Sequence, residues 1–295
     1  MLNLEELAEL LEKNRASAQA QVREFSIGGQ QFSFNSQPAI MGVINLSADS
    51  WYRESVCLSP EAAVRRGKVL RARGAAIIDL GAESTLARAS RSDDALQAAK
   101  FLPVIRALRA ADILVSVETY IPAVARAALE AGANMLNLTG TDRAEEMFRM
   151  VAAHDAAVIL CYVQGANVRE VADFDFGADP VAMMREHFER RIELALKNGV
   201  EKILLDPGLG FYYRNLQDSA VRVRHQMRTF LNTFRLRALG FPVCHALPHA
   251  FEQFREEVRC AEPFFAVLAA LGKTDLFRTH EVPRIKAVLE TMGLF

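Results

Sequence analysis

Hydrophobic residues along this chain fall into eight short, nearly continuous runs, separated by longer stretches in which apolar and polar positions repeat with a helical period. Continuous apolar runs are typical of strands that are buried on both faces of a parallel sheet. The runs predict strands over residues 39–45, 75–80, 113–118, 133–138, 157–162, 202–206, 241–246 and 274–278. The other stretches predict helices over residues 59–73, 94–110, 121–131, 142–153, 178–198, 215–239, 250–271 and 281–293.

Eight strands alternating with eight helices favour one fold. Such units pair in parallel through right-handed crossovers, and eight of them close into a (β/α)₈ TIM barrel. An open, doubly wound sheet is the competing architecture, but no G-x-G-x-x-G motif follows the first predicted strand. We therefore expect an α/β protein built as a TIM barrel.

The segment before the first strand predicts two smaller features. Residues 2–23 carry leucines among Glu and Lys, which indicates an amphipathic helix. Residues 24–27 and 31–35 flank Gly28-Gly29, which predicts a short hairpin that caps the bottom of the barrel. The predicted domains are an N-terminal helical extension, residues 1–24, and a barrel, residues 25–295.

Composition narrows the class of protein. A hydrophobic content of 51% with 24% charged residues is that of a soluble globular protein. The formal net charge of −1 gives no global attraction to nucleic acid or to a membrane surface, and no apolar run approaches the ~18 residues of a membrane span. Four cysteines without a C-x-x-C pair favour a reduced, cytoplasmic protein without structural zinc. Five arginines spaced as a helix face are expected at a solvated or subunit-facing surface: Arg222, Arg224, Arg228, Arg235 and Arg237.

Polar or ionisable side chains end nearly every predicted strand. In a TIM barrel the active site lies at the carboxyl ends of the strands, so these side chains should share one rim. Any one of them alone is equally well explained as a turn former or a helix cap. Their convergence favours a ligand, because each would otherwise lose water without gaining a partner. The residues are Asn45, Asp79 with Glu83, Glu118, Asn137, Gln164, Asp206, His245, and Arg278 with His280.

These groups suit a planar, amide-rich heterocycle beside an anion. A carboxylate such as Asp206 can accept two N–H bonds from an amino-pyrimidine edge, and Asn137 offers both a donor and an acceptor. The turn after Asp206 allows close backbone approach at Gly208 and places Phe211 for stacking. Arg278 and His280 follow the eighth strand, where barrels often hold phosphate.

Six motifs that follow one another from about residue 38 to the C-terminus carry a family resemblance. They are residues 40–45 with Asp49 and Ser50, residues 77–85, residues 116–120, Asn137, residues 205–211 and residues 278–282. In this order they resemble the signatures of the dihydropteroate synthase family and, more broadly, of the pterin-binding barrels. In that family the enzyme joins a dihydropterin pyrophosphate to p-aminobenzoate in folate biosynthesis and releases pyrophosphate, assisted by Mg²⁺.

The resemblance implies roles for individual residues. Asn45 would help to hold Mg²⁺ and pyrophosphate, Asn137 and Asp206 the pterin ring, and Arg278 with His280 the pyrophosphate. It also implies a homodimer. The implied catalytic set is Asn45, Glu118, Asp206, Arg278 and His280, and the implied pterin-binding set is Asp79, Glu83, Thr85, Asn137, Gln164, Gly208, Phe211 and His249.

Three positions depart from the family pattern. Glu118 stands where the family has Asp, and Leu86 stands where it has Arg. The seventh strand, followed in the family by Ser-Arg-Lys, here continues through residues 242–250 with neither Lys nor Ser. We therefore predict a retained pterin half and a rewritten p-aminobenzoate half, with Arg88 and Arg91 the nearest cations in sequence that could compensate.

His245 and His249 leave three readings open. They could bind a metal with His280 or Glu118, one of them could replace the missing Lys, or they could simply pack in the loop. Function also stays open between three classes. The leading one is a transferase of the dihydropteroate synthase type with weak or altered p-aminobenzoate use. The others are a pterin-dependent methyltransferase and a non-catalytic pterin-binding or regulatory homologue.

Overall fold

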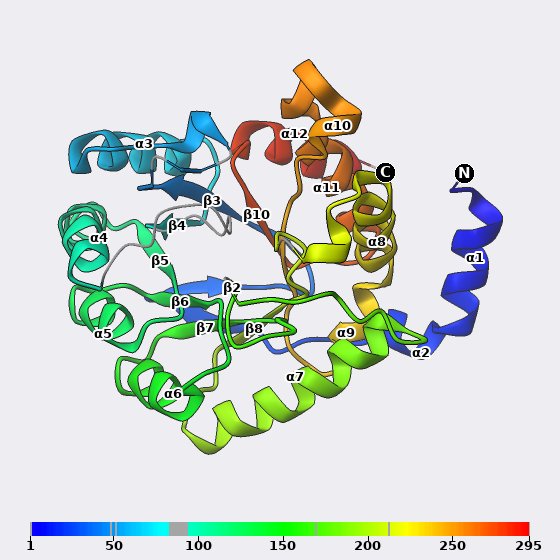
Figure 1. Cartoon of the computed structure of the whole chain (residues 1–295), viewed down its shortest axis with the longest axis horizontal. Coiled ribbons are helices and arrows are strands. Elements are labelled where there is room, and N and C mark those ends of the chain that lie inside the picture. Colours follow the sequence, from blue (N-terminus) through cyan, green and yellow to red (C-terminus); the bar gives the residue numbers. More distant parts are fainter. Residues whose placement is uncertain are drawn as a thin grey trace.

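The computed structural model describes residues 2–47, 49–50, 52–82, 94–168, 170–211 and 213–294. Its centre is an eight-stranded sheet in the order β8-β7-β6-β5-β4-β3-β10-β9, with parallel pairing throughout (Figure 1). The sheet closes where the Leu205 N–H donates to the Pro242 carbonyl at 2.9 Å. The TIM barrel is therefore confirmed. Its strands are β3 (Ala39–Asn45), β4 (Ile77–Gly81), β5 (Leu114–Thr119), β6 (Met135–Leu138), β7 (Ala157–Cys161), β8 (Ile203–Asp206), β9 (Cys244–Ala246) and β10 (Leu276–Thr279).

Helices surround the strands in chain order, as Figure 1 shows. They begin where the sequence signals a start: Ser59 accepts the Ala62 N–H ahead of Pro60, and Asp179 accepts the Val181 N–H ahead of Pro180. The helices are α3 (Pro60–Ala72), α4 (Asp94–Arg109), α5 (Pro122–Glu130), α6 (Ala144–Ala153), α7 (Pro180–Lys197), α8 (Ser219–Asn232), α9 (Phe234–Arg237), α10 (Phe251–Phe254), α11 (Ala261–Leu271) and α12 (Val282–Met292). Three short 3₁₀ turns are η1 (Arg53–Ser55), η2 (Arg214–Leu216) and η3 (Arg255–Cys260).

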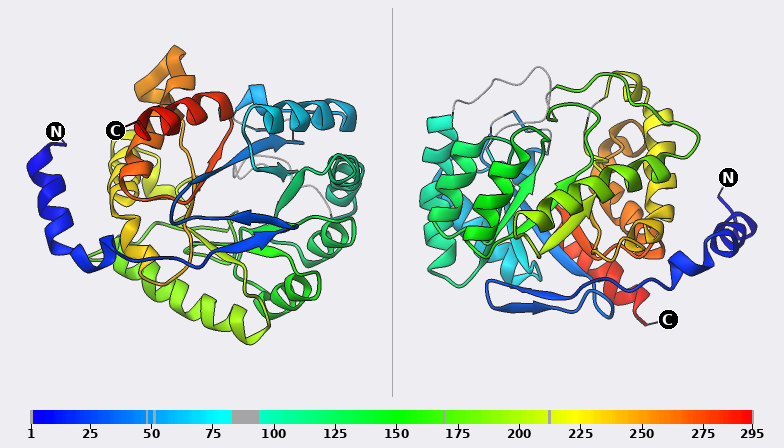
Figure 2. Two further views of the ribbon diagram at one scale, coloured as in Figure 1. Left: turned by 180° about the vertical axis from the view of Figure 1, so that it is seen from behind. Right: turned by 90° about the horizontal axis from the view of Figure 1, so that it is seen from below.

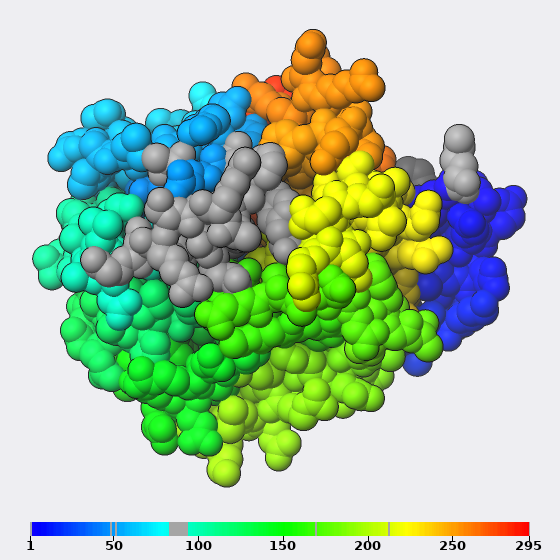
Figure 3. All heavy atoms as spheres, in the orientation of Figure 1, coloured from blue at the N-terminus to red at the C-terminus, as the bar shows by residue number. Residues whose placement is uncertain are grey.

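Two predicted helices are each divided in the structure. The stretch 215–239 breaks at Thr233, whose hydroxyl bonds the Thr229 carbonyl and the ring of His245. The stretch 250–271 breaks at Arg255, which has a φ of 47° in the left-handed region that a regular helix cannot use. The short α10 and η3 that result lie beside α8, as the neighbouring orange and yellow segments of Figure 3 show. Arg222 of α8 pairs there with Glu252 of α10 at 3.0 Å.

A hairpin caps the bottom of the barrel, as predicted. Strands β1 (Phe25–Ile27) and β2 (Gln30–Phe32) pair antiparallel and lie under the barrel in the right-hand view of Figure 2. Ile27 and Phe32 pack into one apolar cluster with the first residues of several barrel strands, including Leu276. Gly28 has a φ of 54°, and a Cβ there would lie 2.6 Å from Leu114, so this turn requires glycine.

The N-terminal segment forms α1 (Leu4–Lys13) and α2 (Arg15–Ala18). Helix α1 buries none of its residues and projects from the side of the barrel (Figures 1 and 2). The predicted domain boundary between residues 24 and 25 stays a prediction. In the part of the chain that the structure describes, no helix has the length and hydropathy needed to cross a membrane.

One of the five arginines expected at a surface lies in the interior instead. The Arg237 side chain is only 6% exposed, and it pairs with Asp275, 3% exposed, at 3.1 Å. Asp275 also accepts the Val243 N–H at 2.7 Å, and Arg237 donates to the Asn35 side chain at 3.1 Å. The prediction was wrong for Arg237 because this arginine ties the N-terminal segment to the barrel bottom.

Replacing Arg237 should destabilise the protein far more than replacing its neighbour Arg235. The Arg237→Ala variant leaves the Asp275 carboxylate buried and unpaired, a loss of about 3–5 kcal/mol. The Arg235–Asp179 pair is partly exposed, so Arg235→Ala should lose at most about 1 kcal/mol. Urea unfolding at pH 8 measures both losses. Equal losses would contradict the role given to the buried pair.

Candidate functional site

A cavity of about 150 Å³ opens at the carboxyl ends of the strands. This is the end of the barrel where TIM-barrel enzymes place their active sites. Most of the residues predicted to form the site line this cavity, although they come from six strands and the loops that follow them. Those residues are Asn45, Glu118, Asn137, Asp206, Gly208, Phe211, His249, Arg278 and His280.

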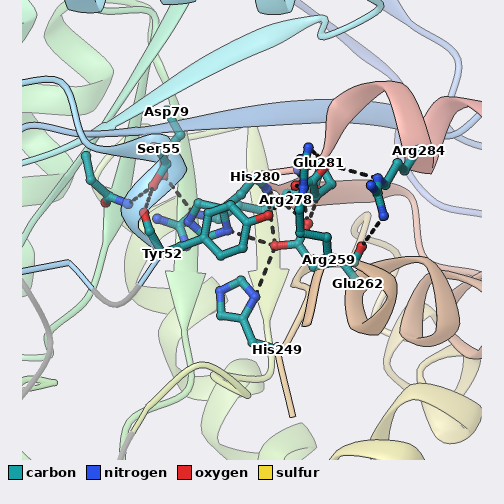
Figure 4. A network of polar contacts seen from close by, with 12 residues as sticks. Tyr52, Ser55, Asp79, His249, Arg259, Glu262, Arg278, His280, Glu281 and Arg284 are labelled. Atoms are coloured by element: carbon teal, nitrogen blue, oxygen red, sulfur yellow. Dashed lines mark hydrogen bonds and ion pairs between the residues drawn. The ribbon is translucent and has the colours of Figure 1, made fainter. Parts of the chain in front are cut away.

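Arg278 is held between two carboxylates inside the barrel mouth. Its Nε donates to Asp79 Oδ2 at 2.7 Å (Figure 4). One of its terminal nitrogens donates to Glu118 Oε2 at 2.5 Å. Burial alone would lower the pKa of Arg278, but Asp79 and Glu118 raise it, so the guanidinium stays charged. The Arg278 cation thus joins β10 to β4 and β5 and still faces the cavity.

Asp206 and Asn137 share one patch of the cavity wall with Cys161. The Cys161 thiol lies 3.3 Å from Asn137 Oδ1 and 3.8 Å from Asp206 Oδ2, and Asp206 Oδ1 accepts the Gly208 N–H at 2.8 Å. Burial raises the pKa of Asp206 to about 6, against the opposing effect of the Gly208 N–H. Burial, followed by the charge of Asp206, raises the pKa of Cys161, which keeps its thiol protonated.

Glu262 of α11 lies close to two histidines at the edge of the same cavity. Its Oε1 lies 2.8 Å from His280 Nδ1 and 3.6 Å from His249 Nδ1. Burial by itself would raise the pKa of Glu262, but the hydrogen bond and charge of His280, together with His249, lower it overall. Burial lowers the pKa of His249 to about 4, so this imidazole is neutral near pH 7.

The ring of Tyr52 packs against both histidines. This ring stacks on His249 with centroids 4.8 Å apart and lies at the same distance from His280 (Figure 4). The Tyr52 hydroxyl donates to Glu281, which Arg259 holds through two hydrogen bonds of 2.6 and 3.0 Å. The loop after β3 is thereby fastened to the start of α12.

Three of the predicted strand-end residues that the structure describes do not line the cavity. Asp79 is fully buried behind the cavity wall, where it bonds Arg278 and Asn137. The Gln164 side-chain amide donates to the Asp175 carbonyl and accepts the Asp175 N–H, and so holds the following loop together. His245 is fully buried on the outer side of β9, where its Nε2 lies 2.6 Å from the Thr233 hydroxyl. Of its three open readings, packing is the one the structure supports. Glu83 and Thr85, and also Leu86, Arg88 and Arg91, lie outside the described residues.

Sequence reasoning missed Glu262, Tyr52 and Cys161. Glu262 carried a usable signal, because it is the only charged residue in the otherwise apolar α11. Cys161 is the last residue of β7, whereas the predicted strand ended one residue later and directed attention to Gln164. Tyr52 had no signal of its own, since its place depends on contacts with loops distant in the sequence.

The residues near Asn45 fit the Mg²⁺ that the family pattern implies. The Asn45 side-chain nitrogen donates to the Ser55 hydroxyl at 2.6 Å, which leaves its carbonyl oxygen as the group on the cavity side. That oxygen and Glu118 Oε2 both lie beside Gly81, within 3.3 and 3.8 Å of where a Cβ of that residue would stand. Mg²⁺ prefers such oxygen ligands and usually completes its shell with water and substrate phosphates.

The barrel and its polar mouth define a class: TIM-barrel proteins that bind a heterocyclic ligand where the strands end. The sequence model of a family described as "pterin binding enzyme" matches residues 41–245. A dihydropteroate synthase of Synechocystis sp. is 32% identical over 222 residues, which cover 74% of this chain and 73% of that protein. A dihydropteroate synthase of Mycobacterium leprae is 34% identical over 175 residues, 58% of this chain and 62% of that protein.

Comparison with a solved structure supports the same family. A Xanthomonas albilineans dihydropteroate synthase with 4-aminobenzoic acid superposes with a TM-score of 0.77 at 27% identity, covering 93% of this chain and 98% of that one. The chain belongs to the dihydropteroate synthase family of pterin-binding enzymes.

The pKa of Asp206 can be tested through stability. With a pKa of about 6 folded and about 3.9 unfolded, the folded state alone holds this proton between those pH values. The contribution of Asp206 to stability therefore falls by about 2 kcal/mol as pH rises from 4 to 7, at about 1.4 kcal/mol per pKa unit and with the unfolded carboxyl already half ionised at pH 4. An Asn at this position does not titrate. The unfolding free energy of Asp206→Asn, measured in urea, should rise relative to wild type by that amount over this range. Parallel pH profiles would show that folding does not shift the pKa of Asp206.

Proposed function

We propose that this protein transfers the methylene-linked dihydropterin group of a dihydropterin pyrophosphate to an amine acceptor, with weak or altered use of p-aminobenzoate. The single observation that supports this most is the patch formed by Asp206, Asn137 and Cys161 at one wall of the cavity. A carboxylate, an amide and a thiol there match the alternating donors and acceptors of a pterin edge.

The pterin ring is proposed to bind with its amino-pyrimidine edge at Asp206 and Asn137. Two N–H donors of the ring would offset the desolvation of the Asp206 carboxylate, which within the protein accepts one backbone N–H, from Gly208. Phe211 lines the same cavity and offers an aromatic face to the ring. Asp79 supports this arrangement from behind, because its Oδ2 accepts the Asn137 side-chain N–H at 3.3 Å.

The proposed reaction breaks the bond between the pterin methylene carbon and the pyrophosphate oxygen. The bonding electrons leave with pyrophosphate, and positive charge develops on the pterin. Asp79 and Glu118 bond the Arg278 guanidinium, and the charge of Asp206 also acts on it. With three carboxylates to one guanidinium, the mouth is arranged to stabilise that positive charge. The amine nitrogen then forms the new bond to carbon and releases its proton. His280 and Arg278 are the proposed contacts of the departing anion.

Mg²⁺ is proposed as a cofactor, held by Asn45. When bound, it would neutralise charge on the pyrophosphate oxygens. The protein's own part is to keep the Asn45 oxygen directed to the cavity, which the hydrogen bond from Asn45 to Ser55 does.

The acceptor side is the part proposed to differ. After β9 the chain presents Leu247, Pro248 and His249 to the cavity, where the family carries Lys and Ser. A carboxylate on the acceptor therefore finds no cation at that position. The Xanthomonas albilineans relative was solved with 4-aminobenzoic acid, which supports an aryl amine as the acceptor class.

One observation favours a non-catalytic pterin-binding protein as the second candidate. Arg278 is already paired with Asp79 and Glu118, which reduces the charge it can offer to a pyrophosphate. Pyrophosphate release separates the two candidates. A pterin-dependent methyltransferase has no such observation in its favour.

The proposed setting is a cytoplasmic homodimer without nucleic-acid or membrane partners. All four cysteines are free thiols, which suits a reducing compartment. Phe264, Val267 and Leu271 are exposed along α11 at helical spacing, which supports a subunit contact there.

The pterin pocket predicts a specific loss of affinity. The Asp206→Asn variant should weaken binding of a dihydropterin by about 1–3 kcal/mol, because one buried group is left mispaired. Isothermal titration calorimetry measures this. Asp112→Asn is the matched control, since it makes the same chemical change at an exposed residue between α4 and β5 and should leave affinity unchanged. Unchanged affinity in Asp206→Asn would exclude this pocket.

The altered acceptor side predicts poor dihydropteroate formation. Each lost charged hydrogen bond is worth about 1.5–3 kcal/mol. This chain lacks both the Lys that the family carries after the seventh strand and the Arg that it carries at the position of Leu86. The two losses together would weaken acceptor binding by roughly a hundredfold or more. Pyrophosphate release should be measured with dihydropterin pyrophosphate and a panel of aryl amines. We expect turnover with an amine that lacks the carboxylate, and little with micromolar p-aminobenzoate. Rapid turnover with micromolar p-aminobenzoate would contradict the altered acceptor preference, and no turnover with any amine would favour the non-catalytic candidate.

A further inference from the structure

Two imidazoles and one carboxylate converge at the edge of the cavity. His249 lies in the loop after β9, Glu262 in the first turn of α11, and His280 directly after β10. One ligand-type atom from each of these three residues lies within 4.8 Å of the other two, and Figure 4 shows the three side chains directed toward one another. We refer to them as the His249–Glu262–His280 cluster.

The spacing of the cluster matches a coordination sphere. Zinc lies about 2.0–2.1 Å from nitrogen and oxygen ligands, so neighbouring ligands of a tetrahedral site are roughly 3.3 Å apart. Glu262 Oε1 lies 2.8 Å from His280 Nδ1 and 3.6 Å from His249 Nδ1. These two distances bracket the required separation. The ligand atoms of the two histidines lie within 4.8 Å of each other, so the imidazoles would approach by up to about 1.5 Å to complete the site.

Glu262 is held in place through its other oxygen. Oε2 accepts the Thr279 hydroxyl and the backbone N–H groups of His280, at 3.1 Å, and Glu281, at 3.2 Å. These bonds leave Oε1 directed at the two imidazoles. Outer hydrogen bonds of this kind fix the orientation of metal-binding carboxylates.

The His249 side chain gives a second, independent indication of a ligand. Its Nδ1 is buried and has no hydrogen-bond partner among the described residues. A buried ring nitrogen without a partner is costly, and stacking against Tyr52 keeps the ring in this position. A metal ion between Nδ1 and Glu262 would satisfy it.

We propose that His249, Glu262 and His280 bind a divalent transition-metal ion of the zinc type. Two histidines with one carboxylate form a ligand set that leaves a further coordination position open. His249 and His280 both line the cavity, so that open position faces the space where substrate binds. An oxygen of pyrophosphate would suit it, a step that rests on the proposed function, whereas metal binding itself does not.

The test is a titration of the full chain in the absence of pterin and pyrophosphate. Protein freed of metal with a chelator is titrated with Zn²⁺ by calorimetry and with Co²⁺ by visible absorption. We expect one tight equivalent of Zn²⁺ and a Co²⁺ spectrum of low coordination number. His249→Ala and Glu262→Gln should each weaken Zn²⁺ binding by at least tenfold, since even changes in the groups around metal ligands cost about 10–100-fold in affinity.

His154→Ala is the matched control. It removes an imidazole at the end of α6 whose Nδ1 lies 2.9 Å from the Met150 carbonyl, and it should leave Zn²⁺ affinity unchanged. Circular dichroism shows whether Glu262→Gln is folded, and if it is not, His249→Ala decides the outcome. Absence of tight Zn²⁺ binding in wild type, or unchanged affinity in folded His249→Ala, would overturn the proposal. Because no substrate is present, either failure leaves the proposed transferase function untouched.

Discussion

The ion pairs of Arg278 with Asp79 and Glu118 are the interaction on which the barrel mouth depends. A guanidinium in the interior is tolerated only when it is paired, and here it reaches from β10 past β3 to carboxylates on β4 and β5. Gly81 lies next to this arrangement, where a Cβ would stand 3.8 Å from Glu118 Oε2, an ordinary contact, and 3.3 Å from the Asn45 oxygen, a tight one. Asp79 in turn holds Asn137, so the ion pairs also orient the amide that we assign to the pterin.

The mouth is divided into two chemically distinct halves. Around Asp206, acceptors and a raised pKa favour a ligand that donates N–H groups or develops positive charge. Around Glu262, two imidazoles stacked on Tyr52 form a compact group that suits either an anion or, as we infer, a metal ion. Placing a leaving anion and a developing cation in separate halves is what ionisation of a pterin pyrophosphate requires.

The strands could be predicted from the sequence because each is a continuous apolar run. The residues at their carboxyl ends then predicted most of the site residues that line the cavity. Side-chain alternation explains the failure at His245: it points outward from β9, whereas the residues on either side of it, Cys244 and Ala246, lie on the inner face. Glu262 stands out in the sequence as the one charge in an apolar helix, but its place at the site could not be predicted, since it depends on the packing of α11 against α12. The same limit applies to Tyr52, whose partners are distant in the chain.

We infer that Asp206 and Asn137 bind the pterin edge while Arg278 stays in its ion pairs with Asp79 and Glu118. A crystal structure of the complex with a dihydropterin pyrophosphate tests it most directly. We expect the amino-pyrimidine edge within hydrogen-bond distance of both side chains, with the pyrophosphate on the side of His280. A pterin ring bound elsewhere, or one that displaces Arg278 from Asp79 and Glu118, would contradict it.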